Sequence, residues 1–246
     1  MNENKWYRKA DGSLITPYQI YGRAKGYPEL FYCEGSTISL KGSTTRKIAF
    51  ERTSKQHVRI SQNTVKDSVL VEKMLMNKQN FKSAKDVDGF VPQASGLYCI
   101  RIKNVHLLPE PFGTILLERG HDILYIGIAS ENLYNRFLNQ ELRAKGHGTF
   151  FRSMGAVLGY KPPKGSLIEK RNKKNYKFSK TDELKIIGWI NENLMVNWVE
   201  SAGDLDSLET SLIVKYLPLL NLSKNPAALQ ILSYLRKECV EIANRN

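Results

Sequence analysis

Two apolar segments of the chain share an unusual design. SGLYCIRIKN (95–104) and ILYIGIAS (123–130) are nearly continuous apolar runs, and each couples one glycine to one tyrosine. Short apolar runs that open at turn residues are typical of buried β-strands. If the two strands pair antiparallel, Tyr98 and Tyr125 can project from one sheet, and the two glycines leave room there for a backbone or a ligand.

The pattern of the following residues predicts helices and a third strand. Apolar side chains at helical spacing predict helices over 65–79, 133–145, 149–160, 181–194, 205–217 and 225–244. Thr181 is the expected N-cap of one of them, and MVNWVES (195–201) is a predicted strand. Because strands and helices alternate irregularly, we expect a mixed α+β fold in which helices wrap a small sheet.

The first 90 residues differ in pattern from the rest of the chain. Residues 1 to about 60 mix Gly, Ser and Thr with short apolar runs, which favours short strands and turns. The stretch 86–96 has the Gly and Pro of a connector, so we place a domain boundary near residue 90. The sequence thus predicts a strand-rich N-terminal module over 1–90 and a second domain over 91–246.

Glu209 stands at an unusual position in the helix predicted over 205–217. Leu205 and Ile213 lie one helical turn to either side of it, so Glu209 points into the apolar stripe. A carboxylate is almost never buried without a partner, because its desolvation costs several kcal/mol. An arginine, a hydrogen-bonding network, a proton or a metal ion could meet it. A buried salt bridge and a hard divalent cation both satisfy the pattern.

Arg136 completes a set of residues suited to phosphodiester hydrolysis. It lies on the helix side opposite Phe137 and Leu138, just after the strand that carries Tyr125. Hydrolysis of a phosphodiester needs a metal to polarise an oxygen, a guanidinium to hold the developing charge and a base to deprotonate water. Tyr98 could be that base only if cationic neighbours lower the pKa of its phenol, which is ordinarily near 10.

The net charge of +13 is unevenly distributed along the chain. Residues 1–90 and the loop 161–180 each carry a net charge of +7, whereas the remainder is close to neutral. An anionic polymer is the natural partner for such a distribution. A solvated surface rich in lysine explains the composition equally well.

The sequence gives no sign of a membrane or secreted protein. No apolar stretch approaches the roughly 20 residues of a membrane span, and the N-terminus lacks the apolar segment of a signal peptide. Cys33, Cys99 and Cys239 are too few and too scattered for a disulfide framework or a zinc site. We therefore expect a cytoplasmic protein.

Four motifs in order resemble the GIY-YIG nuclease family. GLY (96–98) and YIG (125–127) resemble its paired strand motifs, NLYNRF (132–137) resembles its arginine helix, and LETSLIVKYLPLLN (208–221) resembles its glutamate segment. The likeness covers about residues 94–222. It implies a three-stranded antiparallel sheet flanked by helices, and cleavage of DNA with one divalent metal ion.

The resemblance also implies roles for single residues. Glu209 would bind Mg²⁺ or Mn²⁺, and Asn221 would be the structural asparagine. His147, in KGHGTFF, matches a histidine that some members use near the site, and an ordinary loop histidine is an equal alternative. Gln140 stands one turn after Arg136, where some members have a histidine. Residues 104–122 lengthen the connection between the tyrosine strands and are expected to form an inserted loop.

The leading hypothesis from the sequence is a metal-dependent endonuclease acting on double-stranded DNA, with restriction or genome defence favoured over repair. Double-strand cleavage would then need a homodimer or two successive cuts, and a companion methyltransferase is conceivable but not indicated. The N-terminal module and the basic loop would contact phosphates, with Tyr176 and Phe178 available for stacking. The expected loop contacts are Lys164, Lys170, Arg171, Lys173, Lys174 and Lys177. The alternative is a nucleic-acid-binding protein on a catalytically inactive GIY-YIG fold.

Overall fold

The structure is a computed structural model that describes residues 7–8, 14–15 and 62–246. The chain divides into two compact units, Met1–Ser61 and Gln62–Asn246. In the first unit, Tyr7–Arg8 (β1) and Leu14–Ile15 (β2) pair antiparallel. The remainder of the predicted strand-rich module up to Ser61 lies outside the described residues. The predicted boundary near residue 90 falls inside the second unit.

A four-stranded antiparallel sheet forms the centre of the second unit. In the order in which they pair, its strands are β3 (Lys82–Ser83), β6 (Leu194–Glu200), β4 (Gly96–Ile102) and β5 (Ile123–Ala129). The mixed α+β fold is confirmed, but the expectation of three strands is wrong. The fourth strand, β3, has two residues, too short to leave the period-two pattern that marks a strand in the sequence.

Helices cover the sheet on both faces. They are α3 (Gln62–Met76), α4 (Phe112–Glu118), the π-helix η5 (Tyr134–Leu142), α5 (Thr149–Val157), α6 (Lys180–Asn193), α7 (Leu205–Tyr216) and α8 (Gln230–Asn244). Single 3₁₀ turns occur at Lys78–Asn80, Ala84–Asp86 and Val105–Leu107. None of the helices in the described part of the chain has the length and apolarity to cross a membrane.

Three local predictions differ from the structure. The connection 104–122 is not a plain loop, because it contains α4. Helix α6 is capped by Ser179 rather than Thr181, since the Ser179 Oγ accepts a hydrogen bond from the Asp182 N–H at 3.1 Å. Helix α8 starts at Gln230 rather than at 225, because the Asn225 side chain donates to carbonyls of the preceding loop.

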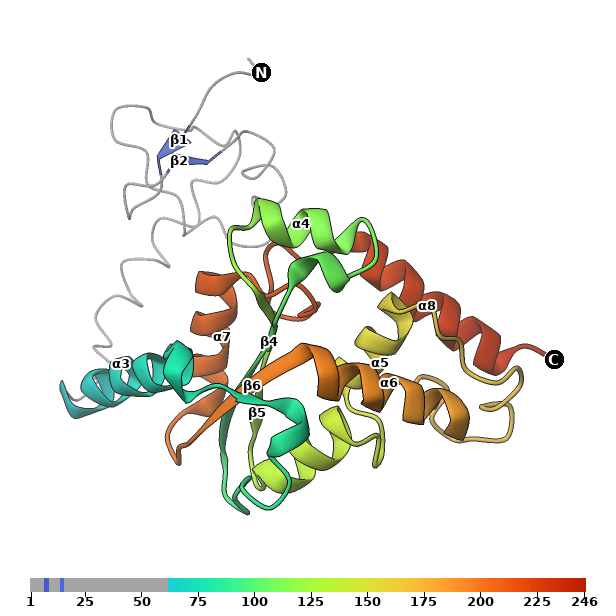
Figure 1. Cartoon of the computed structure of the whole chain (residues 1–246), viewed down its shortest axis with the longest axis horizontal. Helices are drawn as coiled ribbons and strands as arrows, with labels where there is room; N and C mark the ends of the chain where they lie inside the picture. Colours follow the sequence, from blue (N-terminus) through green and yellow to red (C-terminus); the bar gives the residue numbers. More distant parts are fainter. Residues whose placement is uncertain (1–6, 9–13, 16–61) are drawn as a thin grey trace, which may run out of the picture. The chain divides into compact units, whose positions relative to one another are not determined.

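The strands send alternate side chains into two cores. On β4, Leu97 and Cys99 belong to the core under α3 and α7, whereas Tyr98 and Ile100 belong to the core under η5, α5, α6 and α8. Figure 1 shows α3 and α7 on one side of the strands and α5, α6 and α8 on the other. This alternation decides which strand residues can meet in a site.

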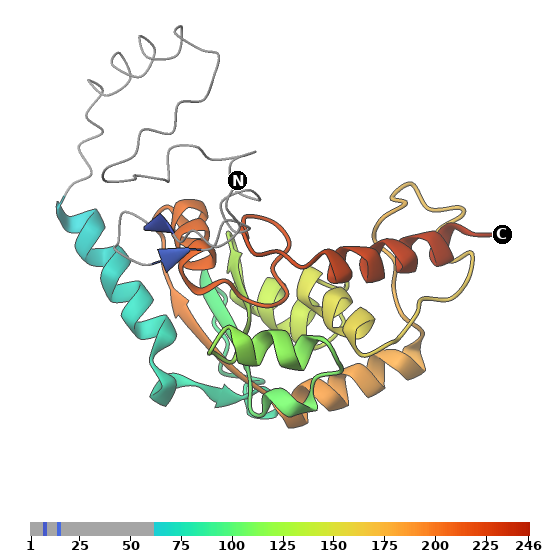
Figure 2. The same ribbon diagram turned by 90° about the horizontal axis from the view of Figure 1, so that it is seen from above.

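The basic loop 161–180 packs against the C-terminal part of α8. The Gly165 N–H donates to the Ile242 carbonyl at 3.2 Å, and the Leu167 N–H donates to the Ala243 carbonyl at 2.7 Å. Figure 2 shows the loop beside this end of α8. The loop is thus tethered to the folded body along part of its length.

Candidate active site

The two tyrosines predicted to project from one sheet share one of its faces. Tyr98 on β4 lies opposite Gly127, and Tyr125 on β5 lies opposite Ile100. Their ring centroids are 6.2 Å apart, and the rings are stacked. The register shifts at the next pair, where Leu124 is an extra residue in β5. Because of this bulge, Leu124 and Tyr125 both face the same core.

Gly127 allows the Tyr98 ring to lie across β5. A Cβ atom at position 127 would come within 2.5 Å of the Tyr98 Oη and 2.9 Å of the Tyr125 ring. Any side chain there would displace both phenols. Gly96 has the same role toward a different neighbour, because a Cβ there would clash with the Val199 carbonyl of β6. The glycines of the two motifs therefore leave room for protein atoms.

A pocket of about 520 Å³ opens beside these phenols at the edge strand β5. Tyr98 and Tyr125 reach it from one face of the sheet, and Glu209 reaches it from α7 on the other face. The pocket is lined by Tyr98, Tyr125, Ile128, Ser130, Glu131, Asn132, Asn135, Arg136, Gln140 and Glu209. Four of the residues singled out in the sequence thus meet in one cavity: both tyrosines, the arginine and the glutamate.

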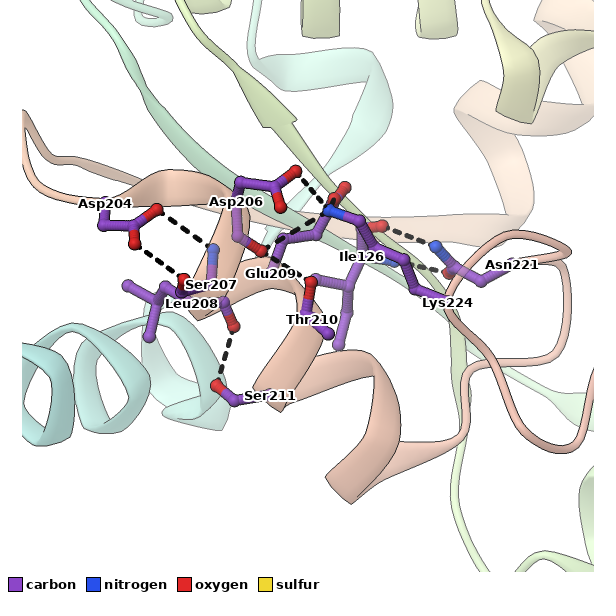
Figure 3. A network of polar contacts seen from close by, with 10 residues as sticks. All are labelled: Ile126, Asp204, Asp206, Ser207, Leu208, Glu209, Thr210, Ser211, Asn221 and Lys224. Carbon is purple, nitrogen blue, oxygen red and sulfur yellow. Dashed lines mark hydrogen bonds and ion pairs between the residues drawn. The ribbon is translucent and has the colours of Figure 1, made fainter. Parts of the chain in front are cut away.

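Asn221 holds the free edge of β5. Its side-chain Oδ1 accepts from the Ile126 N–H at 3.0 Å, and its Nδ2 donates to the Ile126 carbonyl at 2.8 Å (Figure 3). The amide thus satisfies the edge as a neighbouring strand would. Since Ile126 follows Tyr125 directly, Asn221 fixes the backbone that carries a pocket phenol.

Arg136 is paired with a carboxylate that the sequence analysis missed. Its Nη1 lies 2.8 Å from the Glu141 Oε1 and donates to the Gln140 Oε1 at 3.1 Å. Glu141 is fully buried, and its carboxylate also accepts from the Tyr98 hydroxyl at 3.4 Å and the Phe151 N–H at 3.2 Å. The sequence carried the same signal for Glu141 as for Glu209, namely an acidic residue within the apolar stripe of a helix. Glu141 follows Phe137 and Leu138 by one helical turn.

Burial decides the protonation of these groups. It raises the pKa of the Tyr98 phenol well above its usual value, and the Glu141 charge raises it further. Burial raises the pKa of Tyr125 in the same way. Burial also raises the pKa of the Glu141 carboxyl, an effect that the charge of Arg136 partly offsets. Both phenols are therefore protonated at neutral pH, and the condition for Tyr98 to act alone as a base is not met.

Glu209 forms an ion pair with a lysine. The Lys224 Nζ lies 2.7 Å from the Glu209 Oε2 and 2.5 Å from the Asp206 Oδ1, as Figure 3 shows. The side chains of Glu209 and Lys224 are 13% and 25% exposed, respectively. Of the partners considered for Glu209, the structure thus supplies an ion pair, formed with Lys224. Glu209 lines the pocket and both side chains are partly exposed, so water and other cations can reach the pair.

Arg119 fixes the loop that delivers Asn221 and Lys224. Its Nη1 donates to the Leu217 carbonyl at 2.6 Å, and its Nη2 donates to the Ala227 carbonyl at 2.6 Å. One guanidinium therefore ties both ends of the segment between α7 and α8. The sequence held no periodic signal for this contact, since Arg119 lies about 100 residues earlier.

Comparison with known proteins decides the family. The family model of the GIY-YIG catalytic domain matches residues 96–238, which is more than half of the chain. The chain belongs to the GIY-YIG family. Searches among curated proteins and among solved structures gave no significant match. Membership implies a nuclease domain and a nucleic-acid substrate.

GIY-YIG nucleases generally use a divalent metal ion. Within the described residues, no group of three or more His, Cys, Asp and Glu side chains gathers as a metal cluster. A magnesium ion needs less, because one carboxylate with waters and substrate oxygens can hold it. Glu209 fits that role, since its carboxylate lines the pocket and an ammonium group already lies against it.

His147 does not line the pocket that contains Tyr98, Arg136 and Glu209. Its side chain is buried beside Phe151 and Phe178, and its Nε2 lies 3.4 Å from the Phe178 N–H and 3.4 Å from the Glu183 Oε1. Burial lowers the pKa of His147 to about 4, and the charges of Lys177 and other neighbours add to this effect. The imidazole is therefore neutral at neutral pH and packed inside the protein.

The basic side chains of the loop are exposed, but its aromatic ones are not. The exposed set comprises Lys164, Lys170, Arg171, Lys173, Lys174 and Lys177. Lys173 is occupied, because its Nζ donates to the Leu167 and Ile168 carbonyls. Tyr176 and Phe178 are buried in the core below the loop, so the expectation that they stack on bases is wrong. Their rings anchor the loop, because the burial of apolar surface in the core is energetically favourable.

Proposed function

We propose that this protein is a divalent-metal-dependent DNA endonuclease. One observation carries the proposal: two phenols, a guanidinium and a carboxylate from four separate elements converge on one pocket. These groups supply hydroxyl hydrogen bonds, a fixed positive charge and a hard anionic ligand. Phosphodiester hydrolysis can use such a combination.

Tyr98 positions the attacking water in this proposal. Its side chain is buried at the base of the pocket that it lines, and its hydroxyl hydrogen points to the Glu141 carboxylate. An oxygen lone pair would then accept a hydrogen bond from a water molecule in the pocket. When that water attacks phosphorus, its proton passes to the Tyr98 Oη and the phenolic proton passes to Glu141. The raised pKa of Tyr98 excludes a standing phenolate, and this relay does not need one. Tyr125 supports Tyr98, because the two rings stack on the same face of the sheet.

Arg136 holds the phosphate while negative charge develops on it. Its Nη1 is fixed by Glu141 and Gln140, and within the described residues nothing binds its Nη2. Burial alone would lower the pKa of Arg136, but the Glu141 carboxylate raises it. The guanidinium is therefore permanently charged and pre-oriented, which favours the transition state over the ground state.

Glu209 is the proposed metal ligand. A bound Mg²⁺ or Mn²⁺ ion would polarise a phosphate oxygen and lower the barrier to attack. Lys224 neutralises the carboxylate in the absence of that ion and keeps it aimed at the pocket. Asn221 acts through β5, by fixing the backbone beside Tyr125. His147 has no chemical step here, because its ring is enclosed away from the pocket.

The substrate we propose is double-stranded DNA, held by the exposed cations of the basic loop and by the N-terminal residues. A restriction or genome-defence role in the cytoplasm is the favoured setting. One pocket cuts one strand, so cleavage of both strands would use a homodimer or two successive cuts. A partner methyltransferase would accompany a restriction role.

A second function has a specific observation in its favour. Both charged groups expected to act on the phosphate are paired inside the protein, Arg136 with Glu141 and Glu209 with Lys224. A protein that binds nucleic acid without cutting it could keep these pairs permanently. The alternative is therefore a binding protein on an inactive GIY-YIG fold.

Supercoiled plasmid separates the two functions. Incubation with Mg²⁺ or Mn²⁺ should produce nicked or linear DNA, and a chelator should abolish the product. Glu209→Gln should lower the rate at least about a hundredfold, whereas Glu72→Gln, which removes a carboxylate paired with Lys215 away from the pocket, should not. A mobility shift without cleavage under any divalent metal would establish the binding protein instead.

A further inference from the structure

Arg152 and Arg236 form a pair of cations that the proposed reaction does not use. Arg236 on α8 donates to the Thr149 carbonyl at 3.0 Å and the Ser153 Oγ at 2.8 Å, so it lies on the helix that carries Arg152. Its guanidinium carbon is 5.7 Å from the centre of the Tyr176 ring. The hydroxyl of the same tyrosine donates to the Arg152 carbonyl at 3.4 Å. The two arginines thus share one neighbourhood.

Arg152 is buried without an ion pair of its own. It is 9% exposed, and its Nε is enclosed with no hydrogen-bond partner. Within the described residues, its guanidinium forms no hydrogen bond and no ion pair. Burial and the charge of Arg236 lower the pKa of Arg152, whereas Tyr176 and the Glu141 carboxylate raise it. Glu141, however, is already paired with Arg136 at 2.8 Å. Buried cations are almost always paired, so the arrangement calls for an anion.

Helix α5, which carries Arg152, contacts residues of the pocket and of the basic loop. On the pocket side, the ring of Phe150 lies 5.7 Å from the ring of Tyr125, and the Phe151 N–H donates to Glu141. On the loop side, the Tyr176 hydroxyl donates to the Arg152 carbonyl. A strand that enters the pocket and follows the loop would therefore pass this helix.

We propose that Arg152 and Arg236 bind a phosphate group of the nucleic-acid strand at a position other than the one that is cut. The site deepens the proposed function and rests on it. Two guanidinium groups offer forks of N–H donors that match phosphate oxygens. The phosphate charge would offset the repulsion between the arginines, and its contact would fix the register of the strand relative to the pocket.

Arg152→Met tests the site, because it keeps the bulk of the side chain and removes the charge. If Arg152 awaits an anion, the variant should unfold at the same temperature as the wild type or higher, since an unpaired buried cation is gone. Inorganic phosphate should raise the unfolding temperature of the wild type and not that of the variant. These readouts require neither metal nor cleavage.

DNA affinity distinguishes a strand phosphate from a free one. Binding of a labelled duplex is measured in chelator at several salt concentrations. Arg152→Met should weaken binding about tenfold, and the slope of log affinity against log salt should become shallower by about 1. Arg152→Lys, which keeps the charge, should retain that slope. The matched control is Arg101→Met, since Arg101 is also shielded but has a partner, Asp122, at 2.7 Å.

Each outcome decides the assignment. A phosphate response with unchanged DNA affinity in Arg152→Met would define a free-anion site and overturn the strand assignment. Loss of stability in Arg152→Met with no change in phosphate response or salt slope would make Arg152 structural. A wild-type protein that shows all the expected binding effects but never cuts would refute the endonuclease and leave this site standing.

Discussion

The two walls of the pocket depend on carboxylates that differ in burial. The closed wall is formed by Tyr98 and Arg136 with Glu141 behind them, where Glu141 is fully buried and the Arg136 side chain is 33% exposed. The open wall is formed by Glu209 with Lys224 paired to it, and their side chains are 13% and 25% exposed, respectively. A fully buried carboxylate is expensive to leave unpaired, whereas a partly exposed one exchanges its partners at less cost. The difference separates a wall that fixes geometry from a wall that can take up a cation.

Acid provides the largest expected effect on the closed wall. His147 adjoins Gly148, whose backbone lies against the Glu141 carboxylate, since a Cβ atom there would clash with it. Its pKa is lowered from 6.5 to about 4 in the folded protein. Between these values the unfolded chain binds the proton and the folded protein does not. The stabilisation is therefore complete above pH 6.5 and is lost as the pH falls to about 4.

The expected loss is about 3 kcal/mol over that pH window. Urea unfolding at a series of pH values measures it. His147→Asn should flatten this part of the profile, and asparagine tolerates the positive φ of 54° at this position. His106→Asn is the control, because His106 is exposed. A profile that keeps its acid slope in His147→Asn would show that this imidazole is not the group responsible.

The same substitution in both walls gives the next largest contrast. Glu141→Gln removes a buried charge that three groups contact, so we expect a loss of about 2 kcal/mol in unfolding free energy. Glu209→Gln should cost less than about 1 kcal/mol, because its ion pair is partly exposed. Denaturant unfolding at neutral pH compares them. Equal losses would abolish the distinction between the walls.

Lys224→Met sharpens the account of the open wall, with a smaller effect. Its ammonium group competes with a metal ion for the Glu209 carboxylate, so its removal should tighten Mn²⁺ binding several-fold. Calorimetric titration without DNA measures that affinity. Lys215→Met is the matched control, because Lys215 is on α7 and is paired with Glu72 at 2.6 Å. Unchanged or weaker Mn²⁺ binding in Lys224→Met would show that the two cations do not compete.

The sequence predicted the open wall better than the closed one. Glu209 interrupts an apolar helical stripe, and that single contradiction was enough to predict a partner for it. Glu141 interrupts the stripe of its own helix in the same way, so the signal was present at both positions. The difference lay in the resemblance, which pointed to Arg136 and Glu209 and did not point to Glu141.

Other features depended on contacts that no local pattern records. Lys224 contacts Glu209 because Arg119 holds the loop between α7 and α8 in place. Such long-range hydrogen bonds leave no periodic pattern in the sequence. Tyr176 and Phe178 looked accessible in a basic loop, but their rings are buried. Strand composition predicted both tyrosine strands, whereas the β-bulge at Leu124 depends on the pairing of two strands.

The most direct test of the central claim, that the pocket is the catalytic centre, is the single-turnover cleavage rate of Tyr98→Phe on prebound DNA. This variant removes only the hydroxyl that contacts Glu141, and Tyr216→Phe removes a hydroxyl that contacts Glu72 outside the pocket. The account predicts a loss of at least about a hundredfold in rate for Tyr98→Phe with unchanged DNA affinity, and no loss for the control. Equal rates in the two variants would contradict it.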